Sequence, residues 1–174
     1  MEPAQPPATW RLSEAGRAAA VLLAERLTGL GIGAICSSDE PKAAETGSVV
    51  AERLGLTLRQ VPGLREHARE GAGLAPTTAA FEAAVARMLA MPSSRVFGEE
   101  TADEAHVRFT AALAELMTEQ DADVAVVSHG TVISLYVAWA NDLEPFALWC
   151  RLGLPSMVIT DWPSGRSLEL VEQI

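Results

Sequence analysis

The residues best suited to chemistry lie where a short apolar segment ends in a histidine, a glycine and a threonine. Residues 124–128 (VAVVS) predict a buried strand, and the apolar segment 131–140 predicts a buried helix directly after it. His129 would then lie at the carboxyl end of a sheet strand, where open α/β sheets bind ligands. The amides of Gly130 and Thr131, with the helix dipole, favour an anion there. We therefore expect a phosphoryl group beside His129; a histidine satisfied by backbone groups in a buried turn is the alternative.

Two further candidates follow other predicted strands. Lys42 falls in the first turn of a helix that Pro41 is suited to begin. A cation there opposes the helix dipole, so it indicates either an anionic ligand or pairing with Glu40 or Glu45. Glu66 lies in a polar loop and, if held near a phosphoryl pocket, could protonate a leaving alkoxide or activate water. A solvated surface glutamate is the alternative.

The elements expected to position these residues alternate between helix and strand. Thr101 and Glu104 form a capping box, and Ser13 is suited to cap another helix. Helices are expected over 13–30, 41–54, 77–91, 101–119 and 131–140, and strands over 32–36, 56–61, 124–128, 156–162 and 167–171. The earlier strands are apolar on both faces, as in a parallel sheet covered by helices, and the last two suggest a terminal hairpin. The pattern indicates an α/β chain, a three-layer α/β/α sandwich with a mostly parallel central sheet.

Length and composition fit one globular domain over residues 1–174. The chain is 49% hydrophobic and 21% charged. Its Pro-rich start, residues 1–9, predicts an irregular arm. The remaining two histidines, His67 and His106, are expected on the surface. A net charge of −10 disfavours nucleic acid and anionic lipid as partners.

Other sequence features concern metals and location. Cys36 and Cys150 match no zinc-binding or disulfide spacing, so no metal site is expected. No apolar run approaches the roughly 20 residues that span a bilayer. Residues 1–7 lack the regions of an export signal. We therefore expect a cytoplasmic chain without a membrane partner, and leave a homodimer open.

Five short motifs in one order resemble those of the histidine phosphatase (phosphoglycerate-mutase-like) superfamily. They are W-x-L-S with a following G-R at 10–17, S-S to T at 37–46, L-x-E at 64–66, G-E with a following arginine at 98–108, and V-S-H-G at 127–130. The resemblance implies the phosphoglycerate-mutase-like fold and phosphatase or mutase activity through a phosphohistidine. It implies no cofactor, and a small phosphomonoester or phosphate as the ligand.

The resemblance also implies roles for the candidate residues. His129 and Glu66 would be catalytic, and Lys42, Gly130 and Thr131 would bind substrate. The intervening segment 66–100 would cover the pocket and set substrate specificity, although its side chains do not identify the substrate.

Two departures from the family pattern stand out. The family's first strand ends in R-H-[GA], whose histidine takes the phosphoryl group covalently, but all three histidines of this sequence follow Trp10. In addition, Lys42 stands where the family has arginine, so a bidentate clamp becomes a point charge. We expect weak phosphate binding, inactivity of the chain as written and an unfilled slot in the sheet. Either a strand upstream of Met1 completes the natural protein, which we prefer, or the chain is a truncated relative.

Three other functions compete with this interpretation of the sequence. A non-enzymatic phosphoryl-ligand or protein-binding module, which keeps the fold and has lost catalysis, is the alternative. The sequence argues against an α/β-hydrolase, because it has no G-x-S-x-G motif to carry the nucleophilic serine. The glycines at 29–33 do not form a dinucleotide-binding loop, because such a loop follows a strand and these glycines come before the predicted one.

Overall fold

Helices and strands alternate in two parts of the chain, as the sequence predicts. The structure is a computed structural model that describes residues 6–73 and 75–174. The helices are α1 (Glu14–Leu27), α2 (Pro41–Leu54), α3 (Thr78–Ala90), α4 (Ala102–Thr118), α5 (Gly130–Ala140) and α6 (Pro145–Arg151). The strands are β1 (Ile32–Ser37), β2 (Leu58–Gln60), β3 (Asp123–Val127), β4 (Met157–Thr160) and β5 (Ser167–Val171). Helix and strand alternate from α1 to β2 and again from α4 to α5, whereas α3–α4, α5–α6 and β4–β5 follow one another directly. Single 3-10 turns lie at Pro7–Thr9, Pro62–Leu64 and Glu70–Ala72.

The central sheet has three parallel strands in the order β2-β1-β3. β1 and β3 end together, because Ser37 is paired with Val127 and the amide of Ser38 donates to the Val127 carbonyl at 2.9 Å. The loops after these two strands therefore leave the sheet side by side. β4 and β5 form a separate antiparallel hairpin.

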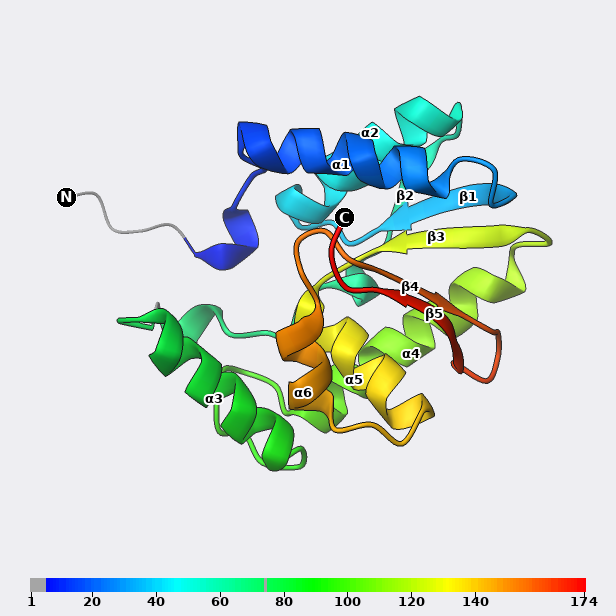
Figure 1. Ribbon diagram of the computed structural model, residues 1–174. Helices are drawn as coiled ribbons and strands as arrows, with labels where there is room; N and C mark the ends of the chain where they lie inside the picture. The colour runs from blue at the N-terminus through cyan, green and yellow to red at the C-terminus, as the bar shows by residue number, and fades with distance from the viewer. Residues whose placement is uncertain (1–5, 74) are drawn as a thin grey trace.

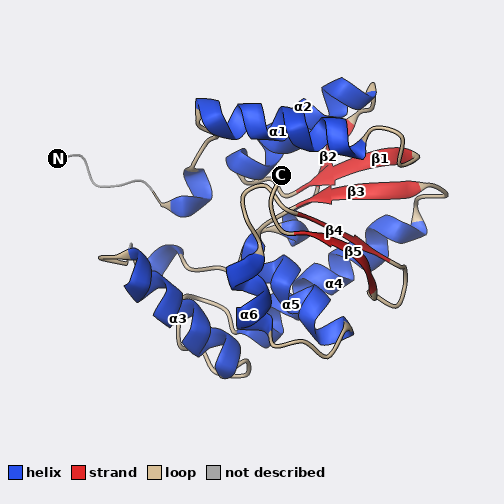
Figure 2. Cartoon of the chain, viewed as in Figure 1, coloured by secondary structure: helices blue, strands red, loops and turns tan. Residues whose placement is uncertain are grey.

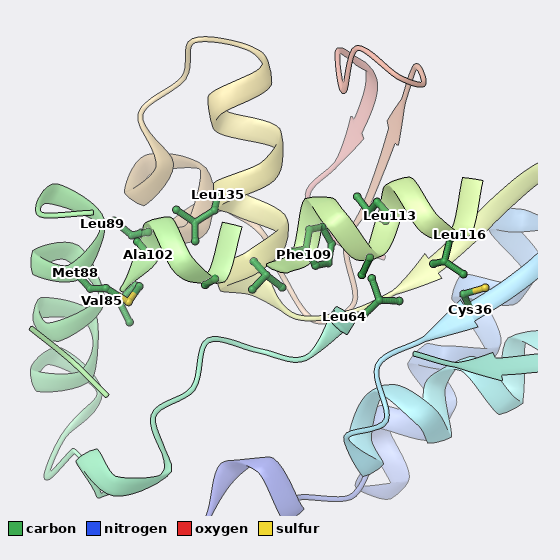
Figure 3. Packing of buried hydrophobic residues seen from close by; sticks show 13 residues of the cluster. Cys36, Leu64, Val85, Met88, Leu89, Ala102, Phe109, Leu113, Leu116 and Leu135 are labelled. Carbon is green, nitrogen blue, oxygen red and sulfur yellow. The ribbon is translucent and has the colours of Figure 1, made fainter. Parts of the chain in front are cut away.

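Helices cover both faces of the sheet, which confirms the three-layer α/β/α architecture (Figures 1 and 2). Neighbouring residues of β1 point to opposite faces, as the period of a strand requires. Ile35 packs with residues of α1 and α2, such as Leu23 and Val50. Cys36 packs on the other side, in a cluster that runs through α4 to α3 and α5 (Figure 3). Both side chains are 1% exposed, so β1 is buried on both faces.

The helix ends follow the predicted local chemistry. The Ser13 hydroxyl accepts a hydrogen bond from the Gly16 amide at 3.1 Å and caps α1. The capping box at the start of α4 is formed in both directions between Thr101 and Glu104. Gly55, in the left-handed conformation, ends α2.

Two parts of the chain differ from the prediction. Residues 1–9 were expected to be irregular, but Pro7–Thr9 forms a 3-10 turn, in which Thr9 donates to the Pro6 carbonyl at 2.8 Å; residues 1–5 lie outside the described residues. Helix α6 was not predicted. The Glu144 carboxylate caps it by accepting from the amides of Phe146 and Ala147. Within the described part of the chain, no helix is both long enough and apolar enough to cross a membrane.

Candidate functional site

His129 occupies the short turn between β3 and α5, where the sequence placed it. It is the N-cap residue of α5, and it is 6% exposed. Its Nε2 atom has no hydrogen-bond partner within residues 6–73 and 75–174 and lies 3.6 Å from Oε1 of Glu40. Burial lowers the pKa of His129, although the charges of Glu66 and Glu40 oppose that shift. The imidazole is therefore mainly neutral near pH 7 and has a ring nitrogen available to a ligand.

Glu66 lies against the N-terminus of the same helix. One carboxylate oxygen accepts from the amide of Thr131 at 3.3 Å, and the other accepts from the amide of His67 at 2.9 Å. Burial by itself would raise the pKa of Glu66, but the charges of Arg69 and His129, together with these amides, leave that pKa below its usual value. An ionised carboxylate thus lies at a helix end that favours anions.

Arg108 and Glu100 hold the loop that carries Glu66. The Arg108 guanidinium donates to the carbonyl oxygens of Gly63, Arg65 and Glu66 at 2.9, 2.9 and 3.1 Å. It also pairs with Glu100 at 2.6 Å, and Glu100 accepts from the amide of Ala68 at 2.9 Å. The G-E segment and its following arginine therefore position this loop through its backbone.

Of the other two histidines, His67 is buried, contrary to the prediction, and His106 is only partly exposed. His67 is 2% exposed, and its Nε2 lies 2.7 Å from the Glu100 carbonyl oxygen. His106 is half-buried on α4, with its ring centroid 4.3 Å from that of Trp139. The loop at 66–69 folds back onto the G-E segment, and α5 packs beside α4; both are tertiary contacts that the local polar sequence did not reveal.

Lys42 reaches the same region, but its charge is already paired. Its ammonium group donates to Oε2 of Glu40 at 2.6 Å and to the Pro7 carbonyl at 2.9 Å. Glu40 is 8% exposed, and its other oxygen accepts from the Glu66 amide at 2.8 Å. Of the two ion pairs weighed for Lys42, the pair with Glu40 is the one that forms. Glu45 instead binds two arginines of the N-terminal segment.

A cavity of about 440 Å³ brings Lys42 and Glu66 together. Its other lining residues include Arg69 and, from the N-terminal segment, Pro7 and Ala8. His129, Gly130 and Thr131 do not line this cavity. They adjoin it through Glu66, which contacts Thr131, and through Glu40, which faces His129.

Gly130 and Thr131 form the first turn of α5. Thr131 is fully buried, and its hydroxyl has no hydrogen-bond partner among the described residues. A Cβ atom at Gly130 would meet Nε1 of Trp149 at 3.6 Å, which is an ordinary contact. The structure therefore gives no steric reason within the protein for glycine at this position. Across residues 6–73 and 75–174, no three His, Cys, Asp or Glu side chains gather as a metal site would require.

Comparison with known proteins decides the family. The model of the histidine phosphatase superfamily (branch 1) matches residues 4–171. The chain belongs to the histidine phosphatase superfamily. A search of curated proteins gives no match.

Several solved structures, two of them of phosphatases, share the fold of this superfamily member. A mycobacterial glucosyl-3-phosphoglycerate phosphatase is 28% identical, with a TM-score of 0.70 over 88% of this chain and 79% of that chain. Bacillus stearothermophilus YhfR is 21% identical, with a TM-score of 0.71 over 97% and 87% of the two chains. The α-ribazole phosphatase from Shigella flexneri is 17% identical, with a TM-score of 0.70 over 98% and 88%. The last two likenesses concern the fold alone.

Sequence reasoning missed two charged residues of this histidine phosphatase site. Arg69 lies 3.6 Å from Glu66, and its Nη1 atom is buried without a partner in the described part of the chain. Glu40 links Lys42, the Glu66 amide and His129. Glu40 had a weak signal, because it falls inside the S-S motif. Arg69 had none, since a single arginine in a polar loop is usually solvated.

Proposed function

We propose that the chain is a phosphomonoester phosphatase, or a mutase-like relative, that binds the phosphoryl group at the N-terminus of α5. In this proposal Glu66 and His129 are catalytic, and Lys42, Gly130 and Thr131 help to bind the phosphate. The reaction uses no metal and takes place in the cytoplasm.

One observation carries the proposal: three buried polar atoms without a hydrogen-bond partner among the described residues belong to residues that contact or adjoin Glu66. They are Nε2 of His129, Oγ1 of Thr131 and Nη1 of Arg69. Glu66 contacts Thr131 and Arg69 directly, and His129 adjoins them in the turn before α5. Buried polar groups are nearly always hydrogen-bonded, so such a cluster favours a polar ligand. The helix N-terminus and Arg69 favour an anionic one.

The proposed reaction has two steps. A nucleophilic histidine attacks phosphorus, the bond from phosphorus to the ester oxygen breaks, and Glu66 gives its proton to the leaving alkoxide. Glu66, now ionised, then takes a proton from the water that attacks the phosphohistidine, which yields phosphate and the free nucleophile. Glu66 is ionised before substrate binds, and an arriving phosphoryl dianion favours its protonated form. His129 donates to a phosphoryl oxygen throughout.

The nucleophile belongs, in this proposal, to a strand that precedes the 174 residues and pairs with β3. One edge of β3 pairs with β1, and no described strand pairs with the other. The β4–β5 hairpin is drawn beyond that edge, on the side away from β1 (Figure 1). Although β3 is apolar, Val124, Val126 and Val127 are only partly buried. An open edge beside His129 supports a missing strand there.

Binding can be tested without turnover. A mycobacterial phosphatase, 28% identical to this chain, has been solved with inorganic phosphate. We expect phosphate and vanadate to raise the melting temperature of the 174-residue chain, since a ligand present at 100 times its Kd adds about 2.7 kcal/mol to the free energy of unfolding. His129→Gln should lose most of this gain, and His106→Gln, on α4, should keep it. A melting temperature that phosphate leaves unchanged would refute the proposal.

Turnover tests the second half of the proposal. The 174-residue chain should hydrolyse p-nitrophenyl phosphate hardly faster than buffer, because the nucleophile is absent. Extending the chain with the in-frame upstream sequence, where this encodes an Arg-His-Gly or Arg-His-Ala strand, should restore hydrolysis, and Glu66→Gln should abolish it again. Rapid hydrolysis by the 174 residues alone would show that the nucleophile is one of their own side chains.

A phosphoryl-binding module without activity is the second candidate. The Lys42–Glu40 pair favours it, because a cation expected to hold phosphate is already neutralised inside the protein. Such a module would gain stability from phosphate and would remain inactive after the upstream strand is added. The two experiments together separate the two functions.

A further inference from the structure

The positive charges around the cavity are not equally available to a ligand. Lys42 is bound to Glu40 and to the Pro7 carbonyl. Arg65 makes two hydrogen bonds of 2.7 Å to Asp39. Arg108 is held by Glu100 and by the carbonyls of the loop. These three cations are held by contacts within the protein and stabilise the structure of the site.

Arg69 differs from these cations. Its side chain is 16% exposed, its Nη2 lies 3.6 Å from Oε2 of Glu66, and its guanidinium carbon lies 5.2 Å from the centroid of the Phe81 ring. Phe81 is itself packed against Phe97 and Trp149, so the guanidinium rests on a fixed aromatic platform. Nη1 is buried and has no hydrogen-bond partner among the side chains and backbone groups that the structure describes. The group is thus positioned with donors to spare.

We infer that Arg69 is a substrate-binding residue, and that its guanidinium donates to an oxygen of the phosphoryl group in the place expected for Lys42. The inference rests on the proposed function and adds a specific ligand to it. A phosphoryl dianion beside the ionised Glu66 requires a neighbouring cation. A guanidinium supplies one with paired donors that match phosphate oxygens.

Arg69 could also act only as the counter-ion of Glu66, at 3.6 Å and without a hydrogen bond. The two roles predict different behaviour in a double-mutant cycle. If Arg69 only neutralises Glu66, its removal should matter little once Glu66 is uncharged. If Arg69 contacts phosphate, its removal should weaken binding in either background.

The experiment is calorimetric titration of the 174-residue chain with inorganic phosphate at pH 8. Arg69→Gln should weaken phosphate binding by about 10-fold or more, because a charge-assisted contact is lost. Arg69→Lys keeps the charge but not the planar guanidinium. Its affinity for phosphate should lie between that of Arg69→Gln and that of the unaltered protein. Arg87→Gln removes the same charge from an exposed position on α3 and should bind like the unaltered protein. Melting curves of each variant show that it is folded.

The decisive pair is Glu66→Gln against Glu66→Gln/Arg69→Gln. A loss of about 10-fold between these two supports direct contact. Equal affinities would overturn the inference and leave Arg69 as a counter-ion. Unaltered affinity in Arg69→Gln alone, with phosphate binding by the parent chain intact, would overturn it as well. Failure of the parent chain to bind phosphate would overturn both this inference and the proposed function.

Discussion

Glu66 is the residue whose charge state governs the site. Its carboxylate is ionised in the absence of ligand. It accepts a hydrogen bond from the Thr131 amide at the start of α5, a position that favours an anion. A bound phosphoryl group must therefore lie beside an existing negative charge. In the proposed mechanism, catalysis by Glu66 and tight binding of phosphate are therefore in conflict at this position, and uptake of a proton by Glu66 on binding would relieve the repulsion.

Replacing Glu66 by glutamine should consequently tighten phosphate binding while it removes turnover. Like charges about 5 Å apart repel by roughly 3 kcal/mol at an effective dielectric constant near 20, so we expect a gain of about 10-fold or more in affinity at pH 8. Glu82→Gln, on the exposed side of α3, changes the net charge equally and should leave affinity unaltered. Calorimetric titration measures both. Weaker binding by Glu66→Gln would mean that the carboxylate helps to hold phosphate.

The sequence predicted some residues of the site and not others for a physical reason. His129 and Glu66 follow predicted strands, and β1 and β3 end at the same edge of the sheet, so local patterns placed both near a ligand. Arg69 becomes notable only because Phe81, from a helix beyond the loop, holds its guanidinium against Glu66. The pairing of Lys42 with Glu40 depends on short-range geometry that could equally have led to Glu45.

At the scale of elements, the turn before α4 fastens the loop of Glu66. The amide of Glu99 donates to the Ala68 carbonyl at 2.8 Å, and the Glu99 carboxylate accepts from the Gly71 amide at 2.6 Å. Gly98 has φ +87°, and a Cβ atom there would lie 2.2 Å from the Ala68 carbonyl oxygen. Glycine is thus required twice over, by its backbone conformation and by close approach.

Gly98→Ala should therefore destabilise the protein more than a positive φ alone explains. Gly29 is the matched control, because it also has φ +87° but a Cβ atom there would meet nothing within 4 Å. We expect Gly29→Ala to cost about 1–2 kcal/mol from the left-handed conformation, and Gly98→Ala to cost at least about 1 kcal/mol more from overpacking. Urea unfolding measures both. Equal losses in the free energy of unfolding would mean that the turn adjusts to the added Cβ atom without further destabilisation.

Most elements were predictable because their ends carry local signals. The structure forms the caps that the sequence predicts: Ser13 caps α1, and Thr101 and Glu104 form the capping box of α4. Helix α6 was missed because it is only seven residues long and its N-cap residue is Glu144, and glutamate is a less usual capping residue than serine or aspartate. The hairpin β4–β5 was predicted from its alternation, but its separation from the central sheet depends on pairing between distant segments.

At the scale of the whole molecule, all three histidines are buried at least in part. Burial is the largest cause that lowers the pKa of each of His67, His106 and His129. A histidine whose pKa is lower in the folded than in the unfolded chain makes folding less favourable once the pH falls below the unfolded value. Near pH 8 neither state carries these protons, so the histidines then add no such penalty.

The free energy of unfolding should thus be level above about pH 7.5 and should fall as the pH drops from about 6.5, the ordinary histidine pKa, towards 5. Between those values the unfolded chain binds protons that the folded chain excludes, so the slope of stability against pH is positive, with at most about 1.4 kcal/mol per pH unit from each histidine. Carboxylates with lowered pKa, such as Asp39 and Glu66, add a separate loss nearer pH 4. Urea unfolding at pH 8, 7, 6 and 5 measures the slope, and His106→Gln should make it shallower. Stability that rises between pH 7 and 5 would mean that the histidines gain protons on folding, and that an anion or carboxylate holds at least one of them charged.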